Sequence, residues 1–202
     1  MDFQTVLKTQ CNVWDFSPQD IPDPVLNRIL EAARIASTAF HLQPWRFVIV
    51  QDETTKTQLA EMCKGQTFVA TASAVVVCCG QKYHNPYNWL GENFYLIDVA
   101  AATAHLQLAA RHEGVGSCWI AAFDHEPIKK LLQVPADYEV IMLVPLGYPA
   151  SEEAFHPTTE CLALEQIVFT EKFGHQWTKS PQEIPPAPKK RPTPSLGLVQ
   201  CR

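Results

Sequence analysis

The chain has 202 residues and 47% of them are apolar, which is enough for one domain of mixed helix and strand with a substantial core. Sixteen Lys and Arg stand against 21 Asp and Glu, giving a net charge of −5, although residues 180–202 alone contribute +3. The acidic body argues against nucleic acid as a partner, because phosphate backbones are bound chiefly by clustered Lys and Arg.

No apolar run approaches the roughly 18 residues of a membrane span, and the N-terminus lacks the basic and apolar regions of a signal peptide. We therefore expect a cytoplasmic protein that does not associate with membranes. Seven cysteines, an odd number in a chain of this length, indicate reduced thiols rather than disulfides. The chain contains no Cys-x-x-Cys or His-x-x-x-His pair, so we expect no metal site.

The first half of the chain predicts two helices and two strands. Asp23 followed by Pro24 marks a helix start, and apolar residues then recur at helical spacing. Two runs rich in β-branched residues predict buried strands. Thr54 or Thr55 can cap the second helix. The expected ranges are 23–35 and 54–64 for the helices, and 46–51 and 74–79 for the strands.

The stretch 91–113 has no Gly or Pro after its first residue and is rich in alanine, so it predicts a long helix. Such a slim, apolar helix suits close burial between other helices or at a subunit interface. Gly114 is placed to end it. Asp124 can cap a further helix that begins near Pro127. The remaining predicted elements are strands at 117–121 and 139–146 and this last helix at 127–132.

Residues 180–202 carry six of the 16 prolines, which excludes a regular helix or a central strand there. We predict one domain over residues 1–179, followed by an extended arm or a disordered tail. The periodicities indicate a mixed α and β protein, but they do not give the topology of the sheet.

Several motifs in this order and spacing resemble those of the nitroreductase family, and together they cover about residues 1–174. A set of motifs in the right order is far more specific than any one of them. The motifs are Ile-Leu-Glu-Ala-Ala-Arg at 29–34, Gln-Pro-Trp-Arg-Phe-Val-Ile-Val at 43–50, the Ala-rich helix with Asp98, Gly-Val-Gly-Ser-Cys-Trp-Ile at 114–120 with Phe123 and Asp124, Leu-Gly-Tyr-Pro at 146–149, and Leu-Glu-Gln-Ile-Val at 164–168.

The resemblance implies an α+β fold, with an antiparallel sheet flanked by helices, the long central helix at a homodimer interface, and C-terminal arms that cross to the partner. It also implies an oxidoreductase that holds FMN in a cleft shared by the two chains. NADH or NADPH would reduce the FMN, and a flat acceptor such as a nitroaromatic, a quinone or a flavin would then take the electrons in a ping-pong cycle. Because the flavin performs the hydride transfer, we expect no catalytic side chain.

The resemblance places the FMN site on three segments. The first would approach the phosphate and ribityl chain, the second would border the flavin ring, and the third would direct backbone N–H groups at the N5 and O4 edge. A histidine in a loop, such as His41, is more often simply exposed than functional. The segments comprise Gln10, Cys11, Asn12 and Trp14; Thr38, His41 and Gln43; and Ile120, Ala121 and Ala122.

The chain departs from the family where the FMN phosphate would bind. The family usually carries Arg or Lys there, whereas residues 10–14 are neutral and residues 160–162 contain no basic side chain. Two functions stay open. One is a flavin oxidoreductase whose phosphate is held by neutral donors or by charges such as Lys8 or Arg46. The other is a non-catalytic dimer that has lost tight FMN or holds an altered ligand. The expected substrate lid between residues 80 and 95 is aromatic, with Tyr83, His84, Tyr87 and Trp89.

Overall fold

The computed structural model describes residues 1–82, 93–156 and 161–177. The chain divides into two units, Met1–Thr159 and Glu160–Arg202. The aromatic residues of the expected lid, the predicted domain boundary after residue 179 and the proline-rich segment all lie outside the described residues. Within the described part of the chain, no helix is long and apolar enough to cross a membrane.

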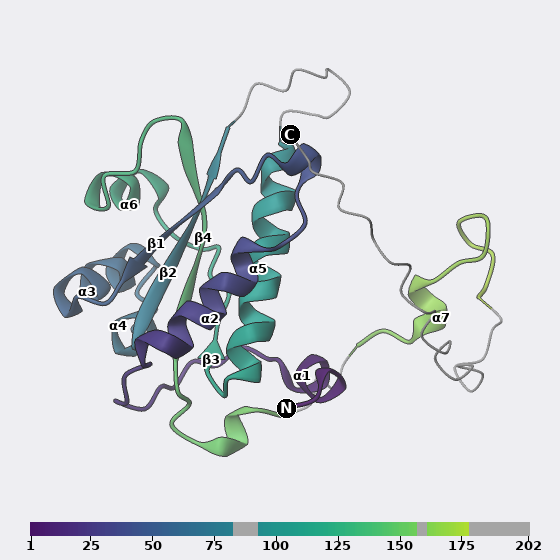
Figure 1. The fold of residues 1–202 in the computed structure, drawn as a ribbon, viewed down its shortest axis with the longest axis horizontal. Helices are drawn as coiled ribbons and strands as arrows, with labels where there is room; N and C mark the ends of the chain where they lie inside the picture. Colours follow the sequence, from purple (N-terminus) through teal and green to yellow (C-terminus); the bar gives the residue numbers. More distant parts are fainter. Residues whose placement is uncertain (83–92, 157–160, 178–202) are drawn as a thin grey trace, which may run out of the picture. The chain divides into compact units, whose positions relative to one another are not determined.

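The first unit is built on a four-stranded antiparallel sheet in the order β1-β2-β4-β3 (Figure 1). Val77 in the second strand pairs with Val48 on one side and with Leu143 on the other. This arrangement confirms the antiparallel sheet that the resemblance implied. The strands are β1 at Trp45–Val50, β2 at Ala74–Gln81, β3 at Gly116–Ser117 and β4 at Tyr138–Gly147.

The central strand β2 is apolar throughout because both faces of the sheet are covered. Side chains alternate between the two faces of a strand. Val75 and Val77 accordingly belong to one apolar core, and Val76 and Cys78 belong to the other. The continuous β-branched run that predicted a buried strand therefore reflects burial on two sides.

Helices α2 and α5 cover one face of the sheet, and α3, α4 and α6 cover the other (Figure 1). The long predicted helix is present as α5 and ends before Gly114, whose φ of +76° suits a glycine stop. The helices are α1 at Phe3–Thr9, α2 at Asp23–Arg34, α3 at Glu53–Met62, α4 at Phe68–Thr71, α5 at Phe94–His112, α6 at His125–Leu131 and α7 at Leu164–Ile167, with 3-10 turns η1 at Ala39–His41 and η2 at Glu152–Ala154.

One predicted helix cap was wrong, and a second was right in position but forms no side-chain cap. Asp52, not Thr54 or Thr55, caps α3, because its Oδ1 accepts the backbone N–H of Thr55 at 2.8 Å. Asp124 stands at the N-cap position of α6 but makes no side-chain cap, because its carboxylate forms an ion pair with Lys64 instead.

The predicted strand 117–121 is shorter than expected. Only Gly116–Ser117 forms regular ladder with β4, followed by an isolated bridge between Ile120 and Leu143. Pro145 in β4 explains the interruption, because proline has no N–H to donate to a neighbouring strand. The regular ladder is therefore interrupted after Ser117, and the two segments pair again only at Ile120 and Leu143.

Candidate functional site

The loop between α2 and β1 is tied to α5 through Asp98, a carboxylate that is only 3% exposed. The Thr38 hydroxyl donates to Asp98 Oδ2 at 2.8 Å, and the backbone N–H of Ala39 donates to Oδ1 at 3.3 Å. The backbone N–H of Gln43 in turn donates to the Thr38 hydroxyl at 3.1 Å. Two donors thus satisfy the buried carboxylate, and the carboxylate holds the loop.

The same loop has an unusual backbone. Phe40, His41 and Gln43 all have positive φ, at 48°, 58° and 49°, a region that residues with side chains rarely adopt. Each costs on the order of 1–3 kcal/mol and persists only when the surroundings hold it. The side-chain nitrogens of His41 and Gln43 lie 2.8 Å apart, so both predicted flavin neighbours are positioned together at the surface.

The segment 10–14 lies against β3. Asn12 pairs with Ser117 in a parallel bridge, and the Val13 N–H donates to the Ser117 carbonyl at 3.0 Å. The indole N–H of Trp14, a side chain that is 60% exposed, donates to the Cys118 sulfur at 3.1 Å. Burial raises the pKa of the Cys118 thiol, so this cysteine is not an activated nucleophile.

The donors at this predicted phosphate end are few. The Cys11 thiol donates to the Ala154 carbonyl at 3.2 Å, and the Trp14 indole is already bonded to sulfur. Arg46 donates to the carbonyls of Gln43 and Trp45, at 3.2 and 2.7 Å, and so belongs to the loop around Asp98. Of the predicted first segment, only the neutral amides of Gln10 and Asn12 remain as side-chain donors.

The third predicted segment contains two exposed alanines. The backbone of Ile120 is occupied, since its N–H and carbonyl both pair with Leu143, at 2.9 and 3.0 Å. Ala121 and Ala122 are exposed, and their N–H groups donate no hydrogen bond to any described residue. A donor role toward a bound ring therefore falls to Ala121 and Ala122 rather than to Ile120.

Two of the three predicted segments lie near opposite ends of α5, and the third, residues 120–122, follows β3 in the chain. Asp98 fastens the loop with Thr38 and Gln43 near the start of this helix, and Arg111 contacts Thr9 near its end. Asp98 and Arg111 are thirteen residues apart in the helix, which corresponds to about 20 Å at the α-helical rise. Sequence reasoning treated Asp98 only as part of a motif and did not single out Arg111.

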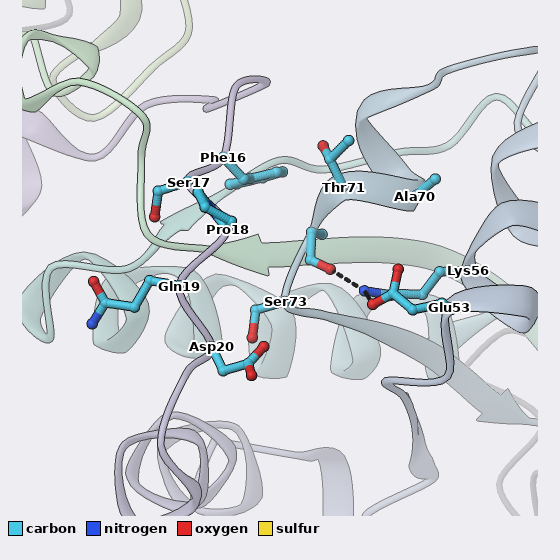
Figure 2. Close-up of a pocket in the computed structure, with 11 residues that line it drawn as sticks. Phe16, Ser17, Pro18, Gln19, Asp20, Glu53, Lys56, Ala70, Thr71 and Ser73 are labelled. Carbon is cyan, nitrogen blue, oxygen red and sulfur yellow. Dashed lines mark hydrogen bonds and ion pairs between the residues drawn. The ribbon is translucent and has the colours of Figure 1, made fainter.

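A polar cavity of about 340 Å³ lies elsewhere, between residues 16–20 and the end of α4 (Figure 2). Lys56, which is 3% exposed, donates to the Ala72 carbonyl at 2.6 Å and pairs with Glu53 at 2.7 Å. The Ser17 hydroxyl oxygen is buried without a hydrogen-bond partner among the described residues. None of the predicted flavin-site residues lines this cavity, and its cation is already neutralised by Glu53.

Comparison with known proteins gives consistent matches. A sequence model of the nitroreductase family matches residues 13–97 and 87–148. A relative from Archaeoglobus fulgidus, whose name includes NAD(P)H nitroreductase, is 30% identical over 155 residues that span 75% of this chain and 87% of the relative. A crystal structure of a nitroreductase family protein from Clostridium novyi superposes with a TM-score of 0.71 at 26% identity, covering 90% of this chain and 99% of the other. The NADPH:FMN oxidoreductase of Vibrio harveyi complexed with NAD+ superposes with a TM-score of 0.76 at 20% identity, covering 85% of this chain and 77% of the other.

Proposed function

The chain belongs to the nitroreductase family and is an oxidoreductase, and from this premise we propose that it uses FMN to pass electrons from NADH or NADPH to a flat acceptor. The Vibrio harveyi neighbour, an NADPH:FMN oxidoreductase, supports this choice of cofactors. FMN, when bound, supplies the ring atom that accepts and returns the hydride. The protein supplies position, hydrogen bonds and exclusion of water.

One observation carries the proposal: the adjacent residues Ala121 and Ala122 are exposed, and their N–H groups have no acceptor among the described residues. Backbone donors of this kind stabilise negative charge on a ring without an acidic or basic side chain. The small alanine side chains also leave space for a second flat molecule. These residues therefore fit the edge of a flavin ring.

We infer that the site is completed by a second copy of the chain. The two groups of site residues are about 20 Å apart along α5, so one chain does not bring them to the same cofactor. In a two-fold dimer that pairs the α5 helices in opposite directions, the loop at Asp98 of one copy meets segment 10–14 of the other, together with residues 120–122, which follow the Ser117 and Cys118 that this segment contacts. FMN would then lie between the subunits.

The surface of α5 supports this dimer. Ile97, Ala101, Ala104 and Leu108 follow helical spacing on the side away from the sheet, and all four are exposed or half-buried. An apolar stripe of this kind calls for a partner. A groove of about 500 Å³ continues it, lined by Met1, Phe3, Val6, Ala32, Ile35, His105, Leu108, Ala109 and His112.

Exposed aromatic rings at both groups support a flat acceptor. Trp14 adjoins Cys118 at one end of α5, and Phe40 belongs to the loop at the other. Such rings stack readily on other planar molecules. Nitroaromatics, quinones and flavins share this flat shape.

The neutral donors at residues 10–14 favour a second candidate, a dimer that holds a flavin without a phosphate or a different ligand altogether. The two candidates differ in what the purified protein carries and does. The oxidoreductase should bind added FMN, should lose the oxidised flavin absorption band when NADH or NADPH is added without oxygen, and should regain it with a quinone. A protein that binds riboflavin but not FMN, or that is never reduced by either nicotinamide, supports the second candidate.

A further inference from the structure

Arg111, in the last turn of α5, is a buried cation that has no acidic partner in the described part of the chain. The residue is 9% exposed and forms no ion pair with any described residue. Its Nε donates to the Thr9 hydroxyl at 2.9 Å and to the Thr9 carbonyl at 3.3 Å, and its guanidinium carbon lies 3.9 Å from the centre of the Phe155 ring. Burial lowers the pKa of Arg111, but an arginine remains charged at neutral pH.

Buried charges are normally paired, because removing an ion from water costs several kcal/mol. Lys56, the other buried cation in the described part of the chain, follows this rule through Glu53 (Figure 2). Arg28 pairs with Glu113 at 2.7 Å even though it is exposed. Arg111 therefore stands apart from these two cations, because no carboxylate among the described residues pairs with it.

The side chain is also held in place. The Nε–H group donates to the Thr9 hydroxyl, and the Phe155 ring covers one face of the guanidinium plane. The two terminal nitrogens donate no hydrogen bond to any residue that the structure describes. A guanidinium fixed in this way keeps a planar pair of N–H donors, the arrangement that binds carboxylate and phosphate groups bidentately.

The position of Arg111 connects it to the predicted phosphate end. Thr9 directly precedes segment 10–14. Gln107 lies one turn earlier on the same face of α5, and its amide donates to the Ser117 hydroxyl at 3.4 Å. Ser117 in turn pairs with Asn12. A row of buried polar side chains thus extends from α5 to the segment where the family carries its phosphate-binding arginines.

We propose that Arg111 binds the phosphate monoester of the flavin nucleotide, in place of the arginines that this chain lacks at residues 10–14. The assignment rests on the proposed flavin function, and it makes the neutral segment compatible with that function. The phosphate could come from FMN or from free inorganic phosphate, and the binding experiment separates these sources.

The test compares Arg111→Met with Arg28→Met, which removes a surface arginine of another helix, in the full chain. FMN and riboflavin are titrated against each variant by quenching of flavin fluorescence. Loss of a charge-assisted bond of about 1.5–3 kcal/mol should weaken FMN binding of Arg111→Met by roughly tenfold or more. Riboflavin binding should be unchanged, and Arg28→Met should bind both flavins like the wild type. Equal weakening of FMN and riboflavin, or no change in either, would overturn the assignment.

A second variant and a measurement with inorganic phosphate complete the test. If Arg111→Met does not fold, Arg111→Lys is used instead, because it keeps the positive charge but loses the paired N–H donors of the guanidinium. It should weaken the binding of FMN and leave that of riboflavin unchanged. Equal weakening of FMN and riboflavin binding would contradict the assignment. Inorganic phosphate should raise the midpoint of thermal unfolding of the wild type but not of the Arg111 variant. If the wild type binds neither flavin, the proposed function fails, and the phosphate arm alone decides whether Arg111 is an anion site.

Discussion

Thr38 donates its hydroxyl proton to the buried carboxylate of Asp98 over 2.8 Å, and this bond joins the loop before β1 to α5. The loop contains three residues with positive φ, including His41 and Gln43, so it needs such a fixed point to keep its conformation. Asp98 therefore acts as a positioning residue for the part of the site that the sequence assigned to the flavin ring.

Asp98→Asn should disturb this loop. The amide of asparagine can accept from Thr38 only by turning its NH2 group toward the N–H of Ala39, which leaves two donors facing each other. We expect a loss of about 1–3 kcal/mol in the free energy of unfolding and weaker binding of both FMN and riboflavin. Urea unfolding and flavin titration measure the two effects. Glu126→Gln, on the exposed side of α6, is the control, and equal behaviour of the two variants would contradict the role of Asp98.

Ala122→Pro should lower flavin affinity sharply, whereas Ala122→Gly should be mild. Proline removes the N–H that we assign to the ring, and glycine keeps it. The proline breaks no internal hydrogen bond of that N–H among the described residues, so any loss reflects the ligand or local backbone strain. Riboflavin titration, together with thermal unfolding of the ligand-free proteins, separates these causes. If the two variants retain flavin equally, residue 122 does not touch the ring through its backbone.

Ala104→Lys should dissociate the dimer, because it places a charge in the exposed apolar stripe of α5. Light scattering at micromolar concentration should give the mass of two chains for the wild type and of one chain for the variant. Gln58→Lys, on the exposed side of α3, introduces a similar charge elsewhere and should remain dimeric. A wild type with the mass of a single chain would refute the shared site.

The buried cysteines predict how stability depends on pH. Burial raises the pKa of the Cys78 thiol from 9.0 to about 12, so this thiol stays protonated in the folded chain after it would ionise in the unfolded chain. The contribution of this thiol to the free energy of unfolding is complete below pH 9. As the pH rises above 9, the free energy of unfolding falls by about 1.4 kcal/mol per pH unit. Urea unfolding between pH 8 and about 11 should therefore show a shallower decline for Cys78→Ala. Parallel curves for the wild type and the variant would contradict this account, since a cavity alone shifts the curve without changing its slope.

Much of this fold could be predicted from the sequence, because its central elements have strong patterns. The β-branched runs identified β2 and β4, and the apolar periodicity identified α2, all within one or two residues. The Ala-rich stretch without Gly or Pro identified α5, which begins three residues later than predicted. The wrong cap of α3 had an equally suitable neighbour, because Asp52 precedes Thr54 and Thr55. At α6 the N-cap residue was right, but only the tertiary structure shows that the Asp124 carboxylate turns to Lys64. The short β3 could have been anticipated from Pro145 in the facing strand.

The site was less predictable, because its residues are joined by contacts between distant segments. Thr103, Gln107 and Arg111 are spaced four residues apart and so share one face of α5, and this spacing is visible in the sequence. That this polar face is buried, and that Arg111 meets Thr9 there, is known only from the structure. The alanine content of the helix drew attention to its small residues instead of to this polar row.

The central claim, an FMN site made by two chains, is tested most directly by co-expressing two damaged chains and isolating the mixed dimer with two affinity tags. One chain carries Asp98→Asn and the other carries Ala122→Pro. A pure dimer, made of two copies of the same variant, therefore has one damaged residue in each of its two sites. If the loop at Asp98 of one copy meets Ala122 of the other, the mixed dimer has one intact site and one with both lesions. We predict that it binds FMN at one site with wild-type affinity, while neither pure dimer does. A mixed dimer in which every site remains weak would show that the flavin lies within a single chain.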